Sequence, residues 1–441
     1  MSEAGKQSAQ HPHKSVEEQL AYLRKGAAEI IREDELKAKL EQSAKTGKPL
    51  RVYLGVDPTA PDIHLGHTVV IRKLKHFQDL GHTAIFLIGD FSAMIGDPTG
   101  QSETRPPLTR EQVDANAKTY LDQVFKILDR EKTEVRYNSE WLGKMSSYDV
   151  VRLCGHYRLA RMLEREDFRS RLENNLPISV HELLYPLLTA CDAVELKSDV
   201  ELGATEQKFN ILIHRDIQRE YGLFPQVVFT MPILVGLDGV KKMSKSLGNY
   251  VGINEPPNEM FGKLMSISDD LMWSYYELLT DFEERVIVRL KEEVRTSVLH
   301  PMDAKMQLAH TIIANFHGEE AARAAKDEFQ RVFRDRQAPE GMRQIRLARE
   351  PNVLRTSTQI APNRWESKAL DCGPNPVKWT SVLSWLEELP SVSEGERLIK
   401  QRAFEINGQV VTDPTVRVDP TAAGSYELRI GKKKFLRIIV E

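Results

Sequence analysis

The sequence predicts an α/β fold in which a parallel sheet is wrapped by helices, followed by an all-α domain and a small α+β domain. Short, fully apolar runs predict buried strands, most clearly at 52–56 and 83–88. Amphipathic segments predict the helices that follow them, at about 66–80 and 109–128. Strands that are apolar throughout and alternate with helices are typical of a parallel sheet covered on both faces.

Length and composition narrow the class of protein. The 441 residues are enough for two to four domains, at roughly 100–200 residues each. The formal net charge of −3 gives no hint of a nucleic-acid partner. No apolar run reaches the ~18 residues that a membrane span needs, and the first fifteen residues are too polar for a secretory signal. The 3 widely spaced cysteines exclude a disulfide scaffold and a CxxC zinc site, and they fit a reducing cytoplasm. We therefore expect a cytoplasmic protein that does not enter the membrane.

The predicted sheet domain occupies residues 49–254. Residues 1–48 are expected to form a polar tail and a helical extension, because apolar residues fall roughly at helical spacing over 16–45. Within the sheet domain, residues from about 140 to 191 are mostly helical in pattern. We therefore expect a helical insertion between two parts of the sheet.

The second half of the chain changes character twice. Residues 255–337 have helical periodicity and no strand signal, which predicts an all-α domain. Residues 338–377 contain several prolines and no clear period, which predicts an extended linker. Residues 378–441 predict a small α+β unit, in which the turn Asn407-Gly408 joins two short strands.

The segment His64-Leu65-Gly66-His67 lies where a strand–loop meets the start of a helix. A helix start presents free backbone N–H groups and a positive dipole end, which together favour an anion. Two imidazoles there can donate hydrogen bonds to phosphate oxygens, and Gly66 permits close approach of a ligand. Taken alone, the segment also fits an ordinary loop with two solvated histidines, or a histidine pair on a metal.

A second segment, Lys241-Lys242-Met243-Ser244-Lys245-Ser246, follows the last predicted strand of the sheet domain. Lys242 and Lys245 lie on a glycine-flanked loop, where two mobile ammonium groups can clamp a polyphosphate as its charge develops. Alone, this segment also fits a solvated basic loop. The two segments together are more specific, because they follow the first and last strands of one α/β domain, 178 residues apart (242 − 64).

The two segments resemble the HxGH and KMSKS signatures of class I aminoacyl-tRNA synthetases, without departure from either. The resemblance implies a Rossmann-like catalytic domain. Three further stretches resemble tyrosyl-tRNA synthetase in particular: Gly55-Val56-Asp57-Pro58-Thr59-Ala60, Gly96-Asp97-Pro98-Thr99-Gly100 and Gly203-Ala204-Thr205-Glu206-Gln207.

The closing unit, from Glu396-Arg397-Leu398-Ile399-Lys400 to Gly431-Lys432-Lys433-Lys434-Phe435, resembles the S4-type RNA-binding module of bacterial tyrosyl enzymes. Tryptophanyl-tRNA synthetase, a related family, lacks such a module. Residues 391–441 hold 9 Lys or Arg and 7 Asp or Glu, so this part carries +2 while the rest carries −5. A nearly neutral total charge is therefore compatible with local RNA binding.

The resemblance implies an amino-acid site. Tyr53 matches a position that contacts the substrate phenol in many family members, and Asp192 matches the carboxylate that accepts the phenol proton. An acceptor that is buried and left unpaired costs free energy, so this pair would reject phenylalanine. Without the resemblance, Asp192 would be interpreted as a helix cap or a surface acid. The amino and carboxylate ends of the substrate are expected at Asp97, Tyr185, Thr189 and Gln207.

The resemblance also implies a nucleotide site. Asp57 and Glu206 match acids on the adenosine or ribose side, since a carboxylate can accept hydrogen bonds from two ribose hydroxyls. Arg105 matches a cation that supports the phosphates, together with His64, His67, Lys242 and Lys245. Without the resemblance, Arg105 would be interpreted as a solvated surface charge. The remaining nucleotide contacts are expected at Gly55, Thr59, Gly66, Gly203, Met243 and Ser244, where a plain tight turn is the alternative for each glycine.

Four positions depart from the family pattern. Thr189 stands where the family usually has Gln, and Cys191 where it often has Tyr. Glu206 replaces a commoner Asp, and Ala204 replaces a commoner Gly. An alanine at position 204 requires a backbone conformation that residues other than glycine can adopt. Thr189 is too short to reach as Gln does, so recognition of the amino group is expected to rely on Asp97, Tyr185 or a bridging water.

The predicted function is two-step aminoacylation by a tyrosine–tRNA ligase. ATP, with Mg²⁺ on its phosphates and no metal site in the protein itself, lies across the carboxyl ends of the strands and converts tyrosine to tyrosyl-adenylate. The tyrosyl group then passes to the terminal ribose of tRNA(Tyr), which the helical anticodon-binding domain and the S4-like unit hold. The resemblance also implies a homodimer.

Two alternatives stay open. Thr189 and Cys191 motivate a paralogue that activates a modified tyrosine or another aromatic amino acid. A non-aminoacylating RNA-binding or splicing protein on the same frame is the other, and the intact signature residues argue against it. No GxxxxGK[ST] loop and no GxGxxG fingerprint after the first strand is present, which disfavours a P-loop NTPase and a dinucleotide oxidoreductase.

Overall fold

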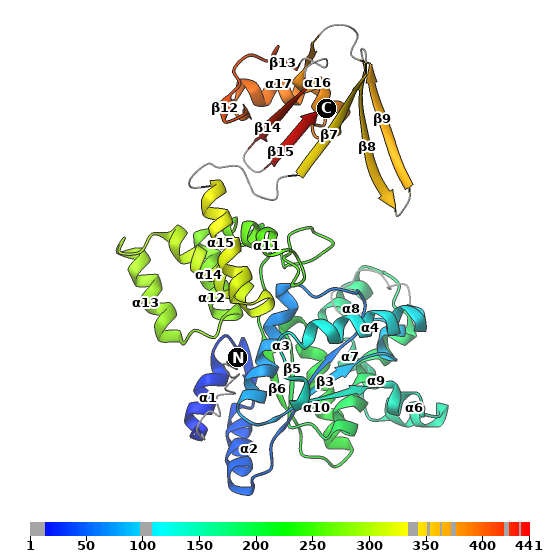
Figure 1. The fold of residues 1–441 in the computed structure, drawn as a ribbon. Helices are drawn as coiled ribbons and strands as arrows, with labels where there is room; N and C mark the ends of the chain where they lie inside the picture. Colours follow the sequence, from blue (N-terminus) through cyan, green and yellow to red (C-terminus); the bar gives the residue numbers. More distant parts are fainter. Residues whose placement is uncertain are drawn as a thin grey trace, which may run out of the picture. The chain divides into compact units, whose positions relative to one another are not determined.

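Among the residues that the structure describes, hydrogen bonds between strands define three sheets, of six, seven and two strands. The structure is a computed structural model, and it describes residues 14–97, 108–333, 343–350, 353–361, 364–371, 376–418, 423–431 and 434–441. The chain divides into two compact units, Met1–Lys326 and Asp327–Glu441 (Figure 1). Among the described residues, no helix has both the length and the apolar composition that crossing a membrane requires.

The six-stranded sheet has the order β1-β6-β5-β2-β3-β4. Strands β2 to β6 are parallel to their neighbours, and β1 is antiparallel to β6, so the predicted α/β fold is confirmed. The strands are β1 (Glu29–Ile31), β2 (Arg51–Val56), β3 (Thr83–Ile88), β4 (Thr133–Tyr137), β5 (Val200–Ala204) and β6 (Val227–Met231).

From β2 the chain crosses to its neighbour β3, and from β5 it crosses to its neighbour β6. These two crossings run in opposite directions along the sheet. Right-handed crossovers therefore place α3 (Leu65–Asp79) and α10 (Lys208–Glu220) on opposite faces. The direction reverses between β2 and β5, which are neighbours. In open α/β sheets, ligands bind outside the carboxyl ends of the strands at such a reversal.

The prediction of one helical stretch over 16–45 is wrong. Two helices, α1 (Val16–Arg24) and α2 (Glu33–Thr46), flank the strand β1. The break occurs at Gly26, whose φ of 67° ends the helical path. Ile30, which fits a helical pattern in the sequence, instead pairs with β6 and covers the edge of the sheet.

The predicted insertion is helical. Five helices, α5 to α9, separate β4 from β5, and the longest of them, α9, lies against α10. Buried side chains of α9 join those of β2 and β3 in one apolar core. The helices of this region are α4 (Arg110–Val124), α5 (Ser139–Leu142), α6 (Ser147–Gly155), α7 (Leu159–Met162), α8 (Glu166–Glu173) and α9 (Val180–Leu196), with short 3₁₀ turns at Ser92–Met94, Arg130–Lys132 and Thr205–Gln207.

The described residues from 257 to 333 form helices and no strand, as the sequence pattern predicts. The packing of α11 on α14 and of α12 on α3 ties these helices together and to the sheet domain. The helices are α11 (Pro257–Met265), α12 (Asp269–Leu279), α13 (Glu284–Arg295), α14 (Pro301–His317) and α15 (Glu319–Phe333).

The prediction of a linker over 338–377 is wrong. Three strands, β7 (Arg343–Glu350), β8 (Val353–Ala361) and β9 (Arg364–Asp371), extend the seven-stranded sheet, in which β7 is parallel to the final strand. Ile345 and Leu347 are buried and alternate with exposed neighbours, which is the period of a strand. The other elements of this unit are β10 (Val377–Lys378), α16 (Trp379–Trp385), α17 (Val392–Lys400), β11 (Phe404–Ile406), β12 (Gln409–Val410), β13 (Arg417–Val418), β14 (Gly424–Ile430) and β15 (Lys434–Val440).

Candidate active site

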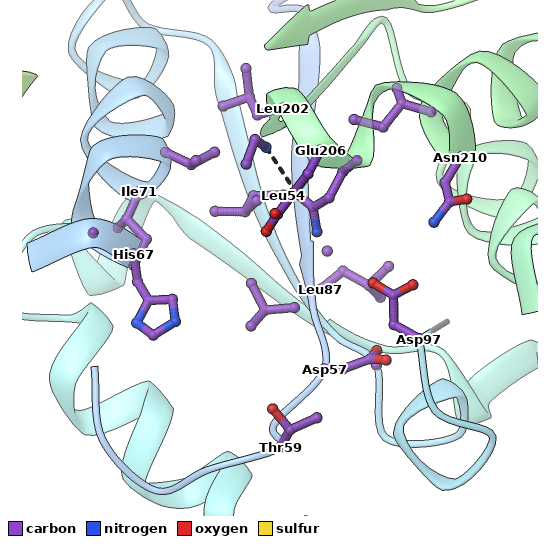
Figure 2. A pocket seen from close by; sticks show the side chains of 18 of the residues that line it. Leu54, Asp57, Thr59, His67, Ile71, Leu87, Asp97, Leu202, Glu206 and Asn210 are labelled. Carbon is purple, nitrogen blue, oxygen red and sulfur yellow. Dashed lines mark hydrogen bonds between the residues drawn. The ribbon is translucent and has the colours of Figure 1, made fainter. Parts of the chain in front are cut away.

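A cavity of about 480 Å³ opens at the carboxyl ends of β2 and β5, where the strand order reverses. Figure 2 shows His67 of α3 on one side and Asn210 of α10 on the other, with Asp57 and Asp97 between them. Most of the predicted site residues line this cavity: Tyr53, Gly55, Asp57, Thr59, His64, Gly66, His67, Asp97, Tyr185, Thr189, Asp192, Glu206, Gln207, Lys242, Met243, Ser244 and Lys245.

The outcome differs for the two remaining predicted site residues. Arg105 lies outside the described residues. Gly203 does not line the cavity; a Cβ there would lie 2.5 Å from Ile211 Cδ1 and 3.0 Å from Gln207 Oε1. Gly203 therefore makes room for the side chains of Ile211 and Gln207. Ala204, beside it, has φ −79° and ψ 160°, an extended backbone that alanine adopts without strain.

The two signature histidines form a stacked pair at the start of α3. His64 caps the helix: its Nδ1 accepts from the Gly66 N–H at 3.1 Å, and its own N–H donates to His67 Nδ1 at 3.2 Å. Because both Nδ1 atoms accept, the ring hydrogens lie on Nε2. Burial lowers the pKa of His64 to about 3 and that of His67 to about 4, so both rings are neutral donors at pH 7.

Gly66 is required for this arrangement. A Cβ at position 66 would lie 2.9 Å from His64 Cε1 and 3.0 Å from its Nδ1. The side chain of His64 would have to move away from the helix start. The sequence predicts that Gly66 permits close approach of a ligand. The structure shows that this glycine also leaves room for the imidazole of His64.

Asn249 holds the lysine loop in shape. Its Oδ1 accepts from the Ser244 N–H at 2.8 Å, and its Nδ2 donates to the Lys242 carbonyl at 3.1 Å and to Asp238 Oδ2 at 2.7 Å. A Cβ at Gly236 would lie 2.3 Å from Asn249 Nδ2, so glycine is needed there. Sequence reasoning did not single out Asn249.

Both signature lysines pair with acids that line the same cavity. Lys242 Nζ lies 2.9 Å from Glu206 Oε2, and Lys245 Nζ lies 3.4 Å from Asp62 Oδ2. Exposed pairs of this kind contribute about 0–1 kcal/mol. A polyphosphate can therefore compete for both ammonium groups. Among the described residues, no group of three or more His, Cys, Asp or Glu side chains is arranged to hold a metal ion.

Asp192 lies within α9 and is buried, which excludes its alternative interpretation as a surface acid or helix cap. Its Oδ1 accepts from Trp141 Nε1 at 2.8 Å and its Oδ2 from Asn138 Nδ2 at 3.4 Å. Burial raises the pKa of Asp192 well above its usual range, although these two donors act in the opposite direction. Sequence reasoning missed both donors, which lie 51 and 54 residues before Asp192 in the chain.

Asp57 connects the expected nucleotide and amino-acid subsites. Its Oδ2 accepts from the Tyr185 hydroxyl at 2.9 Å, and its Oδ1 accepts from Ser92 Oγ at 2.7 Å. A Cβ at Gly89 would lie 2.0 Å from Asp57 Oδ1, so this glycine makes room for the carboxylate. Burial raises the pKa of Tyr185 well above its usual value, which keeps the hydroxyl a donor.

The hydroxyl of Tyr53 has protein partners. It lies 3.4 Å from His214 Nδ1. His214 Nε2 in turn lies 3.0 Å from Thr189 Oγ1. His214 and Glu201 also line the cavity, and sequence reasoning missed both. Helical spacing was the available signal, since His214 follows Gln207 by seven residues, two turns along the same face.

Of the departures at 189 and 191, only Thr189 reaches the cavity. Cys191 is part of the apolar core between α9 and its neighbours. Its Sγ lies 3.8 Å from the Leu187 carbonyl, and burial raises its pKa to about 12. Cys191 therefore has a packing role.

Comparison with protein families identifies the class of protein that this fold and cavity define. Residues 45–334, more than half of the chain, match the family of class I tRNA synthetases for tryptophan and tyrosine. Residues 382–422 match the S4 domain.

Similar proteins narrow the family. The tyrosine–tRNA ligase of Geobacter sulfurreducens is 50% identical over 424 residues, covering 96% of this chain and 99% of the relative. That of Aquifex aeolicus is 49% identical over 423 residues, covering 96% and 99%. The crystal structure of an Archaeoglobus fulgidus tyrosyl-tRNA synthetase complexed with L-tyrosine matches with a TM-score of 0.57 and 25% identity, over 71% of this chain and 100% of that one. The chain thus belongs to the tyrosyl-tRNA synthetase family, so its predicted activity as a tyrosine–tRNA ligase is confirmed.

Proposed function

We propose that this cavity carries out tyrosine activation, with the signature histidines and lysines acting on the phosphates and the α9 residues selecting the amino acid. The observation that carries the proposal is the cavity itself, which brings together two motifs that lie 178 residues apart (242 − 64). ATP would lie across the carboxyl ends of β2 and β5. The tyrosine carboxylate attacks the α-phosphorus in line, and the bond to pyrophosphate breaks.

The protein supplies position and charge rather than a nucleophile. His64 and His67 are neutral and donate from Nε2 to phosphate oxygens, while Lys242 and Lys245 exchange their acid partners for the departing pyrophosphate. Arg105 is proposed to support the same phosphates. Mg²⁺ would reach the site on the ATP phosphates and neutralise part of their charge.

Tyrosine is proposed to place its phenol against Asp192. This buried carboxyl group has two donors already, and a phenol O–H offers a third. Phenylalanine offers none, and an acceptor desolvated without a partner costs about 1–3 kcal/mol. The substrate ammonium is proposed to bind near Asp97 and Gln207, with Tyr185 positioning the carboxylate of Asp57 between the two subsites.

The second step requires tRNA(Tyr). We propose that helices α11 to α15 and the S4 domain hold it, mainly through phosphate contacts and recognition of unpaired bases. Lys434 and Arg437 of β15 are the described cations of the closing strand. A cytoplasmic location is proposed as well.

A homodimer is proposed through the helical insertion. Several large apolar side chains of this region are exposed, which is unusual for a surface that faces only water. Tyr148, Val151 and Val180 are 70%, 68% and 73% exposed. A two-fold axis through such a patch would cover it with its own copy. Sedimentation at micromolar concentration checks this: a monomer at all concentrations would contradict it.

Amino-acid-dependent exchange between ATP and pyrophosphate tests the proposed activation. Each of the twenty amino acids and a set of ring-modified tyrosines is supplied in turn. We expect tyrosine to give the highest rate. Exchange with no amino acid would refute activation at this cavity, and exchange only with another aromatic amino acid would favour a paralogue with altered substrate choice.

A further inference from the structure

Four polar side chains from four elements meet at the amino-acid end of the cavity. Tyr53 of β2, Thr189 of α9, Glu201 of β5 and His214 of α10 are each less than 8% exposed, and all four line the cavity. Buried polar groups are costly unless they are hydrogen bonded. Here they satisfy one another, so the group is a built part of the pocket.

Glu201 fixes the imidazole of His214. Its two carboxylate oxygens lie 2.9 and 3.0 Å from His214 Nδ1, which therefore carries a hydrogen and donates it. Gln226 Nε2 also donates to Glu201 Oε2, which gives the carboxylate a second partner. The ring of His214 consequently has one orientation, with Nε2 directed at Thr189.

The hydroxyl of Thr189 is committed within the protein. Its oxygen lies 2.9 Å from the Tyr185 carbonyl and 3.0 Å from His214 Nε2. A hydroxyl has one hydrogen, which goes either to Nε2, when the hydrogen on Nδ1 is the only one on the ring nitrogens, or to the carbonyl, when Nε2 carries a second ring hydrogen and donates it to Oγ1. In both cases no hydrogen is left for a substrate. Thr189 thus positions the imidazole and does not act as a shorter version of glutamine.

The two side chains are also complementary in size. Glutamine at position 189 would extend from α9 toward the space that the imidazole occupies, because the ring nitrogen lies only 3.0 Å from the threonine oxygen. Threonine ends at that contact and leaves the space to His214. The gap expected from the sequence beside a short residue 189 is therefore filled by protein.

We propose that His214 is a specificity-determining residue of the amino-acid pocket, and that Thr189 and His214 form one unit, anchored on Glu201, that limits the room beside the substrate ring. The inference rests on the proposed activation of tyrosine. It implies that the pocket excludes tyrosines with a bulky substituent next to the hydroxyl, and that residues 189 and 214 cannot be exchanged independently.

A double-mutant cycle tests this unit by pyrophosphate exchange with tyrosine and with 3-iodotyrosine. For Thr189→Gln alone, we expect kcat/KM for tyrosine to fall at least about 30-fold from overpacking, and adding His214→Ala should restore at least about tenfold. His214→Ala alone should lower the preference for tyrosine over 3-iodotyrosine at least about tenfold. Additive effects in the cycle, or an unchanged preference in His214→Ala, would overturn the proposal.

Two controls separate selectivity from folding. His156→Ala removes a histidine that does not line the cavity and should leave the preference unchanged. Glu201→Gln keeps the shape of the anchor but not its charge, and we expect it to shift the preference in the direction of His214→Ala, with thermal unfolding measured alongside. An unshifted preference in a folded Glu201→Gln protein would refute the anchoring role. Loss of exchange in the unmodified chain would instead refute the proposed activation itself.

Discussion

Replacing Lys245 with alanine removes one ammonium group from the phosphate side of the cavity. In the structure its Nζ pairs with Asp62 at 3.4 Å, and the two side chains are 27% and 58% exposed. Such a pair contributes about 0–1 kcal/mol, so the stability of the fold should barely change. In the proposed mechanism the same group faces developing charge in the transition state, where loss of one stabilising donor costs roughly 10²–10³-fold in rate.

The assay is pre-steady-state formation of tyrosyl-adenylate, with tyrosine affinity measured separately. We expect the rate to fall by that factor and the dissociation constant for tyrosine to change less than about twofold, because a loss confined to the transition state spares ground-state binding. Lys37→Ala is the matched control, since Lys37 also makes a partly exposed ion pair but does not line the cavity. Equal losses in rate and tyrosine affinity would refute the assigned role of Lys245.

Three further predictions concern the histidine pair and the buried thiol. Gly66→Ala should lower adenylate formation at least about tenfold with little change in tyrosine affinity, because its Cβ displaces His64; an unchanged rate would contradict this. The free energy of unfolding should fall as the pH drops from about 6.5 to 4, because burial lowers the pKa of His64 to about 3 and of His67 to about 4, so the unfolded chain takes up protons that the folded chain does not. Urea titrations at several pH values check this, and His67→Asn should weaken the dependence. Cys191 should react with iodoacetamide at pH 8 far more slowly in the folded protein than in urea, since burial raises its pKa to about 12. Mass spectrometry of the modified peptide measures both rates, and equal rates would show that the thiol is exposed.

The sequence predicts the parallel sheet and most of the residues that line the cavity, because both depend on patterns within short stretches of the chain. Strands that are apolar along almost their whole length, such as β2 and β3, have one stable environment, a sheet covered on both faces. The residues of the family motifs lie after strands β2, β5 and β6 or at the start of a helix, so the topology of the sheet brings them together.

What the sequence does not predict depends on distant partners. β1 is only three residues long, and it is a strand because the edge of β6 offers it hydrogen bonds. In β7 the alternation of buried and exposed residues is short as well, and this segment forms a strand because it pairs with β15. His214 and Asn249 act through contacts with residues far along the chain or in a folded loop. Residue types at these positions carry no signal by themselves.

The most direct test of the central claim follows one turnover of the enzyme through both chemical steps. Enzyme, ATP and tyrosine are mixed, the products are quenched at intervals, and tRNA(Tyr) is then added. We predict that tyrosyl-adenylate accumulates to about one per active site and is consumed as tyrosyl-tRNA appears, at matching rates. Consumption of ATP without tyrosyl-adenylate, or an adenylate that never transfers to tRNA, would contradict it.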